Sequence, residues 1–236
     1  MEIFGLSKRG LVRTCNEDKF YTDGQSLTIL ADGMGGHVAG ETASATVIDE
    51  VRAYVMQDRS DWKNEVTLQE AVQAANAAIR EKVRADADLD GMGSTALVTY
   101  AEDGFLFWAH VGDSRIYLYS DGILRQITQD HSLVAQMVAE GTMTAQEAAV
   151  HPSRHVITRS VGTEDDLQVD AGRVMLEPGN MVLMCSDGLT SMIDDDTIRN
   201  TLIAYEGDGE TCVRELMRLV YEAGATDNVT IIALAV

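Results

Sequence analysis

Hydrophobic residues along the chain follow two different spacings. Short apolar runs, rich in β-branched residues and bounded by turn-forming residues, predict β-strands. They lie at 2–7, 19–23, 27–31, 94–100, 105–111, 115–119, 122–127, 168–175, 181–185 and 229–235. Apolar residues that recur about every four positions predict amphipathic helices. These lie at 38–57, 68–85, 195–204 and 209–223, and in two short pieces within 131–150 that are separated at Gly141.

The segments between these runs carry signals for turns and for one helix start. The Asp-Gly pairs at 103–104 and 121–122 each stand between two predicted strands, where Asp-Gly favours a tight hairpin turn. Thr67 and Glu70 have the spacing of a capping box before the second helix. Runs of strands joined by hairpins and alternating with helices predict an α+β fold with a largely antiparallel core and helices outside it. The periodicity leaves the number of sheets open.

The composition is that of a globular chain without an internal boundary. Hydrophobic residues make up 45% of the 236 residues, and only two prolines occur. We therefore expect one domain over 1–236. We expect no signal peptide, because residues 1–4 lack a basic region followed by an apolar core. No apolar run approaches the roughly 20 residues that cross a bilayer. Cys15, Cys185 and Cys212 are too scattered for a disulfide framework. These features predict a cytoplasmic protein.

Acidic residues dominate the charge. The chain has 38 acidic and 18 basic residues, which gives a formal net charge of −20. Such a surface repels nucleic acid backbones and anionic lipids, so we expect neither nucleic acid nor membrane as a partner. Divalent cations held by clustered carboxylates would neutralise part of this excess.

Four short aspartate motifs point to such a cluster. They read Ala-Asp-Gly-Met-Gly-Gly at 31–36, Gly-Asp-Ser-Arg at 112–115, Ser-Asp-Gly at 186–188 and Thr-Asp-Asn at 226–228. Three of them adjoin an apolar run, which places their carboxylates at the ends of buried strands. Clustered carboxylates repel one another unless a cation holds them, and oxygen ligands suit Mg²⁺ or Mn²⁺ better than zinc. The motifs therefore predict a metal-dependent enzyme.

Each motif also has a simpler interpretation. Asp-Gly after an apolar run is a common hairpin turn, and one such pair alone would favour the turn. The glycines that follow Asp32, the asparagine that follows Asp227, and the occurrence of the four motifs together favour a site.

The candidate ligands can be ordered from the residues themselves. Asp32 is the best central ligand, because the glycines after it allow close approach of the backbone, and the Gly33 carbonyl could complete an oxygen shell. Asp187 and Asp227 are natural co-ligands. Two ions about 3.5–4 Å apart would form a hydrolytic site that makes hydroxide available near neutral pH and clamps a phosphoryl oxygen.

Arg13 precedes the acidic pair Glu17 and Asp18 by four and five residues. A guanidinium group is well shaped to bind a phosphate through two hydrogen bonds. A surface arginine in a turn is the alternative, and the spacing alone favours that alternative.

Seven motifs together resemble the metal-dependent (type 2C) Ser/Thr protein phosphatases, in the form found in compact bacterial members. The resemblance spans about 1–236 and keeps the order of the family's motifs. The motifs are Arg-Thr-Cys-Asn-Glu-Asp at 13–18, Ala-Asp-Gly-Met-Gly-Gly-His at 31–37, Gly-Ser-Thr-Ala at 93–96, Val-Gly-Asp-Ser-Arg at 111–115, Asp-His-Ser at 130–132, Leu-Met-Cys-Ser-Asp-Gly-Leu at 183–189 and Thr-Asp-Asn-Val at 226–229.

The resemblance implies a four-layer αββα sandwich, in which two antiparallel sheets are flanked by helix pairs. It also implies a binuclear Mn²⁺/Mg²⁺ centre that activates a hydroxide for direct attack on phosphorus. By position, Asp32 would bridge both metals, the Gly33 carbonyl would help hold one, and Asp187 and Asp227 would complete the other.

The remaining implied roles lie at the edge of the metal centre. Glu17 and Asp18 match the acidic pair near the metals, and Arg13 matches the phosphate-binding arginine. Asp113, with Asp187, matches the position that holds a third, weaker metal in bacterial members.

One position departs from the animal members of the family. They carry a histidine two residues after the bridging aspartate, proposed as the general acid, where this chain has Met34. A water on the metal or His37 is then the candidate proton donor, and we expect His37 to bind substrate. A polar turn residue is an equally good interpretation of His37.

The segment at about 131–160 matches the family's mobile flap. It reads as two short helices and a polar loop, and we assign substrate choice to it as a hypothesis. The histidines at 110, 131, 151 and 155 have no mutual metal-ligand spacing, so we expect all four to be structural.

The leading functional hypothesis is a phosphoserine/phosphothreonine protein phosphatase that reverses Ser/Thr kinase signalling. Its partners would be phosphorylated proteins, with a kinase and its substrates among them, and the chain would be a monomer. One alternative is a regulatory phosphatase of a partner-switching pathway, although such relatives usually lack the flap. Another is a catalytically silent metal-binding scaffold, against which the intact set of charged motif residues argues.

Overall fold

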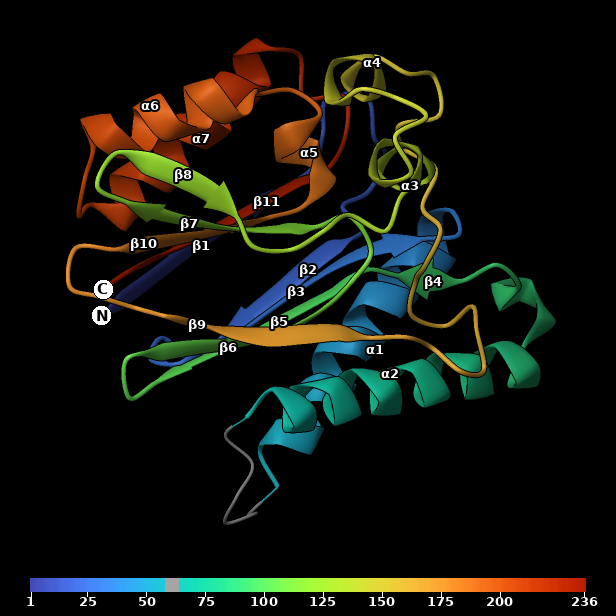
Figure 1. Ribbon diagram of the computed structural model, residues 1–236. Coiled ribbons are helices and arrows are strands. Elements are labelled where there is room, and N and C mark those ends of the chain that lie inside the picture. Colours follow the sequence, from blue (N-terminus) through green and yellow to red (C-terminus); the bar gives the residue numbers. More distant parts are fainter. Residues whose placement is uncertain (58–63) are drawn as a thin grey trace.

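Two antiparallel β-sheets lie face to face in the computed structural model, which describes residues 1–57 and 64–236 (Figure 1). The strand order of the first sheet is β1 (Glu2–Lys8), β11 (Val229–Ala235), β10 (Met181–Cys185), β7 (Arg115–Ser120) and β8 (Ile123–Gln126). The order of the second is β2 (Asp18–Thr22), β3 (Leu27–Met34), β5 (Ala96–Glu102), β6 (Phe105–Val111) and β9 (Asp170–Met175), with β4 (Gly93–Ser94) paired to β3.

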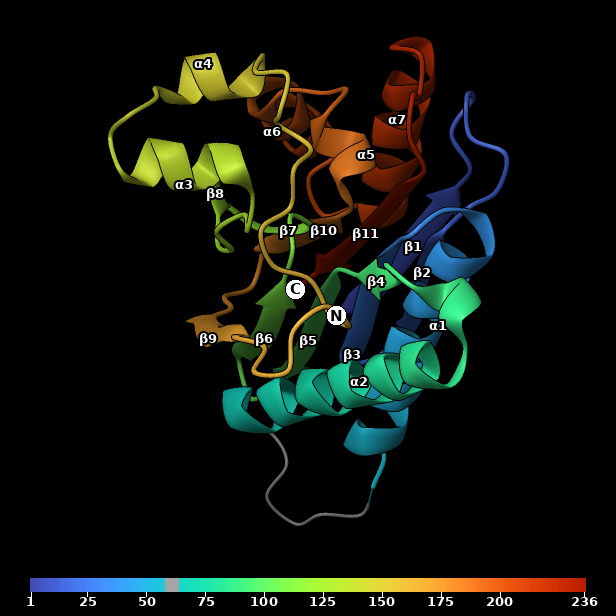
Figure 2. The same ribbon diagram turned by 90° about the vertical axis from the view of Figure 1, so that its right-hand side faces the viewer.

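Helices cover the outer face of each sheet (Figures 1 and 2). The second sheet is covered by α1 (His37–Val55) and α2 (Glu65–Ala85), which is followed by the 3₁₀ turn η1 (Ala87–Leu89). The first sheet is covered by α5 (Asp187–Thr190), α6 (Asp195–Ala204) and α7 (Gly209–Glu222). The layers are therefore αββα, and the predicted α+β sandwich is confirmed.

Both faces of the central strands are buried. In β10, Leu183 and Cys185 pack against the helices, whereas Val182 and Met184 pack against the other sheet. Alternate residues of a strand point to opposite faces, so a strand covered on both sides needs apolar residues at every position. This explains why such strands read as unbroken apolar runs rather than as an alternation of apolar and polar residues.

The two predicted hairpin turns are present. At 103–104 the φ angles are 50° and 76°, and at 121–122 they are 51° and 78°. Positive φ at both central residues is the geometry of a type I′ turn, which Asp-Gly favours. These turns join β5 to β6 and β7 to β8.

The predicted start of the second helix is wrong. The cap is Asn64, whose side chain accepts a hydrogen bond from the Thr67 amide at 3.0 Å, and α2 begins at Glu65. Thr67 lies inside the first turn, and Glu70 instead accepts a hydrogen bond from the Tyr54 hydroxyl at 2.8 Å. Asparagine also caps helices well, so the local signal contained two competing starts.

The strand that carries Asp32 is longer than its apolar run. β3 continues to Met34, because Gly33 and Met34 pair with the two residues of β4. The apolar run predicts Asp32 at a strand end, but Asp32 lies within β3, opposite Asp18 of β2. The end of β3 is set by its pairing with β4, which lies far away in the chain, so the local hydrophobic pattern does not predict it.

The predicted flap segment contains α3 (Leu133–Ala139) and α4 (Ala145–Ala149). Gly141 lies between them with a φ of 71°, so the break in the helix falls where the sequence predicted it. The two short helices pack on each other and stand beyond the ends of the sheets (Figure 2). Among the helices of the described residues, none has the length and apolar character required to span a bilayer.

The Asn64 cap can be tested by substitution. Asn64→Ala removes the acceptor for the Thr67 amide, so we expect the free energy of unfolding to fall by about 1 kcal/mol. Chemical denaturation measures this change. Glu70→Gln is the matched control and should cost less than about 0.5 kcal/mol, because its hydrogen bond lies on the exposed surface. A larger loss with Glu70→Gln than with Asn64→Ala would contradict the assigned cap.

Candidate active site

Carboxylates from distant parts of the chain meet at one end of the sandwich. They line a cleft of about 610 Å³. Its walls come from the loop before β2, the end of β3, the β6–β7 loop, the flap, the start of α5 and the loop before β11. The lining residues are Arg13, Glu17, Asp32, Gly33, Met34, Gly35, Gly36, Asp113, His155, Ile157, Asp187, Thr226, Asp227 and Asn228.

Most of the residues predicted from the sequence are in this cleft. The structure brings together Arg13, Glu17, Asp32, Gly33, Asp113, Asp187 and Asp227. Asp18 lies beneath the cleft rather than on its wall. His37 is the first residue of α1, but its side chain falls outside the described part of the structure.

Asp18 is a buried carboxylate held from one side only. Its Oδ2 accepts hydrogen bonds from the hydroxyls of Ser186 and Thr230, both at 2.8 Å. Its Oδ1 is buried and has no hydrogen-bond partner among the described residues. A buried oxygen without a partner is costly, so this carboxylate suits a cation or an ordered water beside it.

The carboxylates raise one another's pKa values. Burial, followed by the charges of neighbouring carboxylates, raises the pKa of Asp32 well above its usual range. Burial raises the pKa of Asp18 to about 6 and that of Asp113 to about 8, with Asp187 adding to both. Desolvation and like charge both disfavour the ionised form, and a bound cation would oppose both effects.

The donor set fits hard divalent cations. The candidate ligands are carboxylate oxygens and the carbonyl of Gly33, which are the donors that Mg²⁺ and Mn²⁺ prefer. Within residues 1–57 and 64–236, no three His, Cys, Asp or Glu side chains are already drawn together as a closed metal cage. The fit therefore rests on the chemistry and burial of the carboxylates around the cleft, and above all on the unpaired oxygen of Asp18.

The Gly-Ser-Thr-Ala motif at 93–96 holds the backbone of Asp32. The Asp32 amide donates to Thr95 Oγ1 at 2.9 Å, and the Asp32 carbonyl accepts from the Thr95 amide at 2.9 Å. The Ser94 hydroxyl donates to the same carbonyl at 2.9 Å. These three hydrogen bonds fix the residue that the sequence made the central ligand.

Gly33 is required by the packing of α1. A Cβ atom at this position would lie 1.9 Å from the carbonyl oxygen of Gly40, in the first turns of the helix. Any side chain would push the helix away from the strand. The glycine after Asp32 therefore permits close contact between α1 and β3.

Arg13 lines the cleft from the turn before β2, with a side chain that is 47% exposed. Its Nη2 donates to Asp227 Oδ2 at 2.6 Å, and this hydrogen bond is the main cause that raises the Arg13 pKa. The pair joins a predicted phosphate-binding residue to a predicted metal ligand. Guanidinium has five N–H donors, so Arg13 retains donors for a phosphate while it contacts Asp227.

His155 lines the cleft, contrary to our prediction that it is a structural histidine. Its Nδ1 lies 3.6 Å from Asp187 Oδ2, and that carboxylate raises its pKa. By contrast, His110 and His131 are buried away from the cleft lining, as expected. The sequence carried no spacing signal for His155, because only the folded flap brings it near Asp187.

Known proteins resemble this chain over nearly its whole length. The model of the protein phosphatase 2C family matches residues 11–224. Serine/threonine protein phosphatase PstP of Mycobacterium tuberculosis is 41% identical over 226 residues, which are 96% of this chain and 43% of PstP. Protein phosphatase PhpP of Streptococcus pneumoniae is 38% identical over 240 residues, which are 98% of this chain and 96% of PhpP. The chain thus spans less than half of PstP and nearly all of PhpP.

Solved structures agree with the fold. The catalytic domain of PstP, in complex with two manganese ions, matches with a TM-score of 0.87 at 37% identity and covers 98% of this chain and 96% of that chain. Stp1 from Staphylococcus aureus matches with a TM-score of 0.91 at 32% identity and covers 100% of this chain and 95% of that chain. The motifs, the αββα layers and these matches show that the chain belongs to the protein phosphatase 2C family.

Proposed function

We propose that this chain is a phosphoserine/phosphothreonine protein phosphatase that depends on Mn²⁺ or Mg²⁺. The observation that carries the proposal is the cleft itself, in which acidic residues from five separate motifs surround one arginine. Relatives named as serine/threonine phosphatases, and the two manganese ions in the PstP structure, support it. Substrates would be phosphorylated proteins.

The acidic residues in and beneath the cleft, together with the Gly33 carbonyl, have proposed parts in holding ions. Asp32 would be the central ligand, the Gly33 carbonyl would help hold one ion, and Asp187 and Asp227 would hold the other. Glu17 would belong to the acidic pair near the ions. Asp18 would act through its unpaired Oδ1. Bound ions would supply a hydroxide nucleophile near neutral pH and screen the charge of the phosphoryl group.

The remaining residues would handle the substrate. Arg13 would orient the phosphate through the N–H groups that Asp227 leaves available. Met34 lines the cleft and cannot carry a proton, so the leaving oxygen must receive its proton elsewhere. His155 lies on the cleft wall, and it joins water and His37 as a candidate proton donor. Asp113 with Asp187 would hold a third, weaker ion.

The finer features of the function remain proposals of the same kind. We propose a single domain over 1–236, a monomer in the cytoplasm, and a Ser/Thr kinase whose products this enzyme reverses. A partner-switching phosphatase would be expected to lack the flap, which is present here as α3 and α4. A silent scaffold would be expected to lack one of the cleft's charged residues.

The central ligand provides the first test. Asp32→Asn removes a charge from the middle of the cluster, so we expect hydrolysis of para-nitrophenyl phosphate and of a phosphothreonine peptide to fall by more than about 100-fold. Assays in Mn²⁺, Mg²⁺ and excess EDTA measure this, and the wild type should be inactive in EDTA. Glu41→Gln is the control, since its exposed ion pair with Lys19 lies on the surface. Turnover by the wild type in EDTA would contradict the metal dependence, and a wild type that binds Mn²⁺ without turnover would indicate the scaffold.

Arg13 provides a second test, because its two proposed contacts can be separated. Arg13→Ala removes the phosphate ligand but frees Asp227, so kcat/KM should fall by about 10- to 100-fold while Mn²⁺ binding by calorimetry stays at least as tight. Arg13→Lys should recover only part of the loss, because an ammonium cannot bind two phosphate oxygens in the same plane. Equal loss of Mn²⁺ affinity in both variants would argue that Arg13 serves the metal centre instead.

The raised pKa values give a third test through metal-linked stability. Protons and cations compete for the same carboxylates, so Mn²⁺ should raise the melting temperature more at pH 8 than at pH 6. In EDTA, the raised pKa values mean that the folded state binds more protons than the unfolded state, so these carboxylates contribute less stability as pH rises from about 4 to 8. Each proton released on binding changes the Mn²⁺ affinity by about tenfold per pH unit.

Calorimetric scans at both pH values, with and without Mn²⁺, measure the difference. Burial lowers the pKa values of His110 and His131, so these two residues contribute alike with and without Mn²⁺. The pKa of His155 is raised by Asp187, so its proton is part of the release that the scans measure. An increment from Mn²⁺ that is the same at pH 6 and pH 8 would show that cation binding displaces no protons from the cluster.

A further inference from the structure

The Asp-His-Ser motif at 130–132 has no part in the proposed metal chemistry. It forms hydrogen bonds to the loop that carries Asp113. The His131 amide donates to the Gly112 carbonyl at 2.8 Å, and the Gly112 amide donates to His131 Nδ1 at 3.0 Å. Only 7% of His131 is exposed, so water competes little for these hydrogen bonds. The backbone just before Asp113 is therefore fixed by the first residue of the flap.

The residue before His131 holds the other side of the same loop. Asp130 accepts three hydrogen bonds from Arg115, from Nε to Oδ1 at 2.9 Å, from Nε to Oδ2 at 3.1 Å and from Nη2 to Oδ2 at 2.7 Å. Gln126 donates to Oδ1 as well, at 2.9 Å. A bidentate ion pair fixes orientation as well as distance. Asp113 thus lies between Gly112, which His131 holds, and Arg115, which Asp130 holds.

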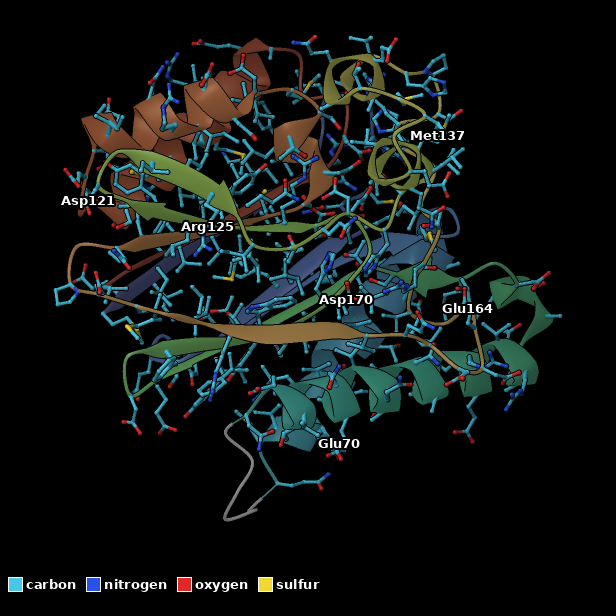
Figure 3. The ribbon with its side chains drawn as sticks, in the orientation of Figure 1. Glu70, Asp121, Arg125, Met137, Glu164 and Asp170 are labelled. Atoms are coloured by element: carbon cyan, nitrogen blue, oxygen red, sulfur yellow. The ribbon has the colours of Figure 1, made fainter. Side chains whose placement is uncertain are left out.

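The far edge of the His131 ring contacts the flap exit and β9. Because Nδ1 accepts a backbone N–H, the ring proton is on Nε2, which donates to Asp170 Oδ2 at 3.2 Å. Arg159 Nη1 donates to Asp170 Oδ1 at 2.8 Å. Arg159 Nη1 also lies 3.0 Å from Nε2, but two donors cannot bond to each other, so both use Asp170. Figure 3 labels Asp170, at the start of β9, and Met137, in helix α3 of the flap.

The backbone closes the flap at the same point. The Thr158 amide donates to the His131 carbonyl at 2.8 Å, and the Leu133 amide donates to the Val156 carbonyl at 2.9 Å. Both ends of the flap are consequently joined at His131.

The Asp113 loop is also connected to Asp32. Ser114 Oγ and Thr95 Oγ1 share a buried hydrogen bond of 3.0 Å, and Thr95 Oγ1 accepts from the Asp32 amide at 2.9 Å. A displacement of the Asp113 loop would therefore also displace Asp32, because Ser114 and Thr95 connect the two.

We propose that Asp130 and His131 are positioning residues that form a clasp between the flap and the Asp113 loop. The clasp sets the place of the Asp113 carboxylate for a weakly held cation, and through Asp170 it fixes the two ends of the flap. This inference rests on the metal-binding role proposed above for Asp113. It assigns to the Asp-His-Ser motif a part in cation binding without any contact to the cation.

Two substitutions of His131 separate the two edges of its ring. In His131→Asn, the amide oxygen can take the place of Nδ1 and accept from Gly112, but the bond to Asp170 is lost. In His131→Gln, the longer side chain can reach Asp170 but loses the acceptor beside Gly112. We expect His131→Gln to weaken the weakest Mn²⁺ site by about tenfold, and His131→Asn to keep it within about threefold of the wild type.

Two readouts follow these substitutions, and neither depends on turnover. Calorimetric titration with Mn²⁺ gives the affinity of the weakest site, and the rate of trypsin cleavage after Arg154 reports how firmly the flap is held. His131→Asn should be cleaved several-fold faster than the wild type, whereas His131→Gln should be cleaved at nearly the wild-type rate. The reverse assignment of the two effects, or no effect of either variant, would overturn the clasp.

Further variants distinguish a failure of the clasp from a failure of the proposed site. Asp113→Asn should abolish the weakest Mn²⁺ site. If Asp113→Asn binds Mn²⁺ like the wild type, the ligand role of Asp113 is wrong and the clasp loses its basis. If Asp113→Asn loses the site while His131→Gln keeps it, the clasp alone is wrong. Should His131→Gln not fold, Asp130→Glu replaces it, because it keeps the negative charge near Asp113 but alters the hold on Arg115, and it should lower Mn²⁺ affinity in the same way.

Discussion

Repulsion between carboxylates that are withdrawn from water is the interaction on which the rest of the site depends. Asp18 and Asp32 lie directly opposite each other on β2 and β3, and their pKa values are raised by burial and by neighbouring negative charge. Two such groups are unfavourable in a folded protein by themselves. Their persistence in the cleft is explained if the functional form of the protein holds cations there, and the unpaired oxygen of Asp18 is the clearest sign of it.

The sandwich supplies the rigidity that this arrangement needs. Strands covered on both faces by apolar residues are hard to displace, and they end together at the cleft. The packing of α1 on Gly33 and the hydrogen bonds of Ser94 and Thr95 hold Asp32 in place against the repulsion of its neighbours. A site of fixed charges on such a support does not have to reorganise when a charged substrate binds, which is the condition for effective electrostatic catalysis.

The flap differs from the rest of the site in how it is attached. Its helices pack mainly on each other, while its two ends meet at His131. A segment with few contacts to the core and a firm base can change position without disturbing the central carboxylates. The hydrogen bonds of His131 to Gly112 and Asp170 place that base next to Asp113, so the flap and the proposed cation site share one connection.

Reading the amino-acid sequence is enough to predict the layers, the Asp-Gly hairpin turns, the helix break at Gly141 and nearly all the charged residues of the cleft. This is possible because apolar periodicity, Asp-Gly turns and strand-adjacent aspartates are local patterns with local physical causes, and because the order of the motifs resembles a known family. Four further features became visible only in the folded chain: Asn64 caps α2, β3 extends through Asp32, Arg13 pairs with Asp227, and His155 lies near Asp187. These features depend on contacts between residues far apart in the chain, and the free energy of such contacts is not encoded in the spacing of neighbouring residues.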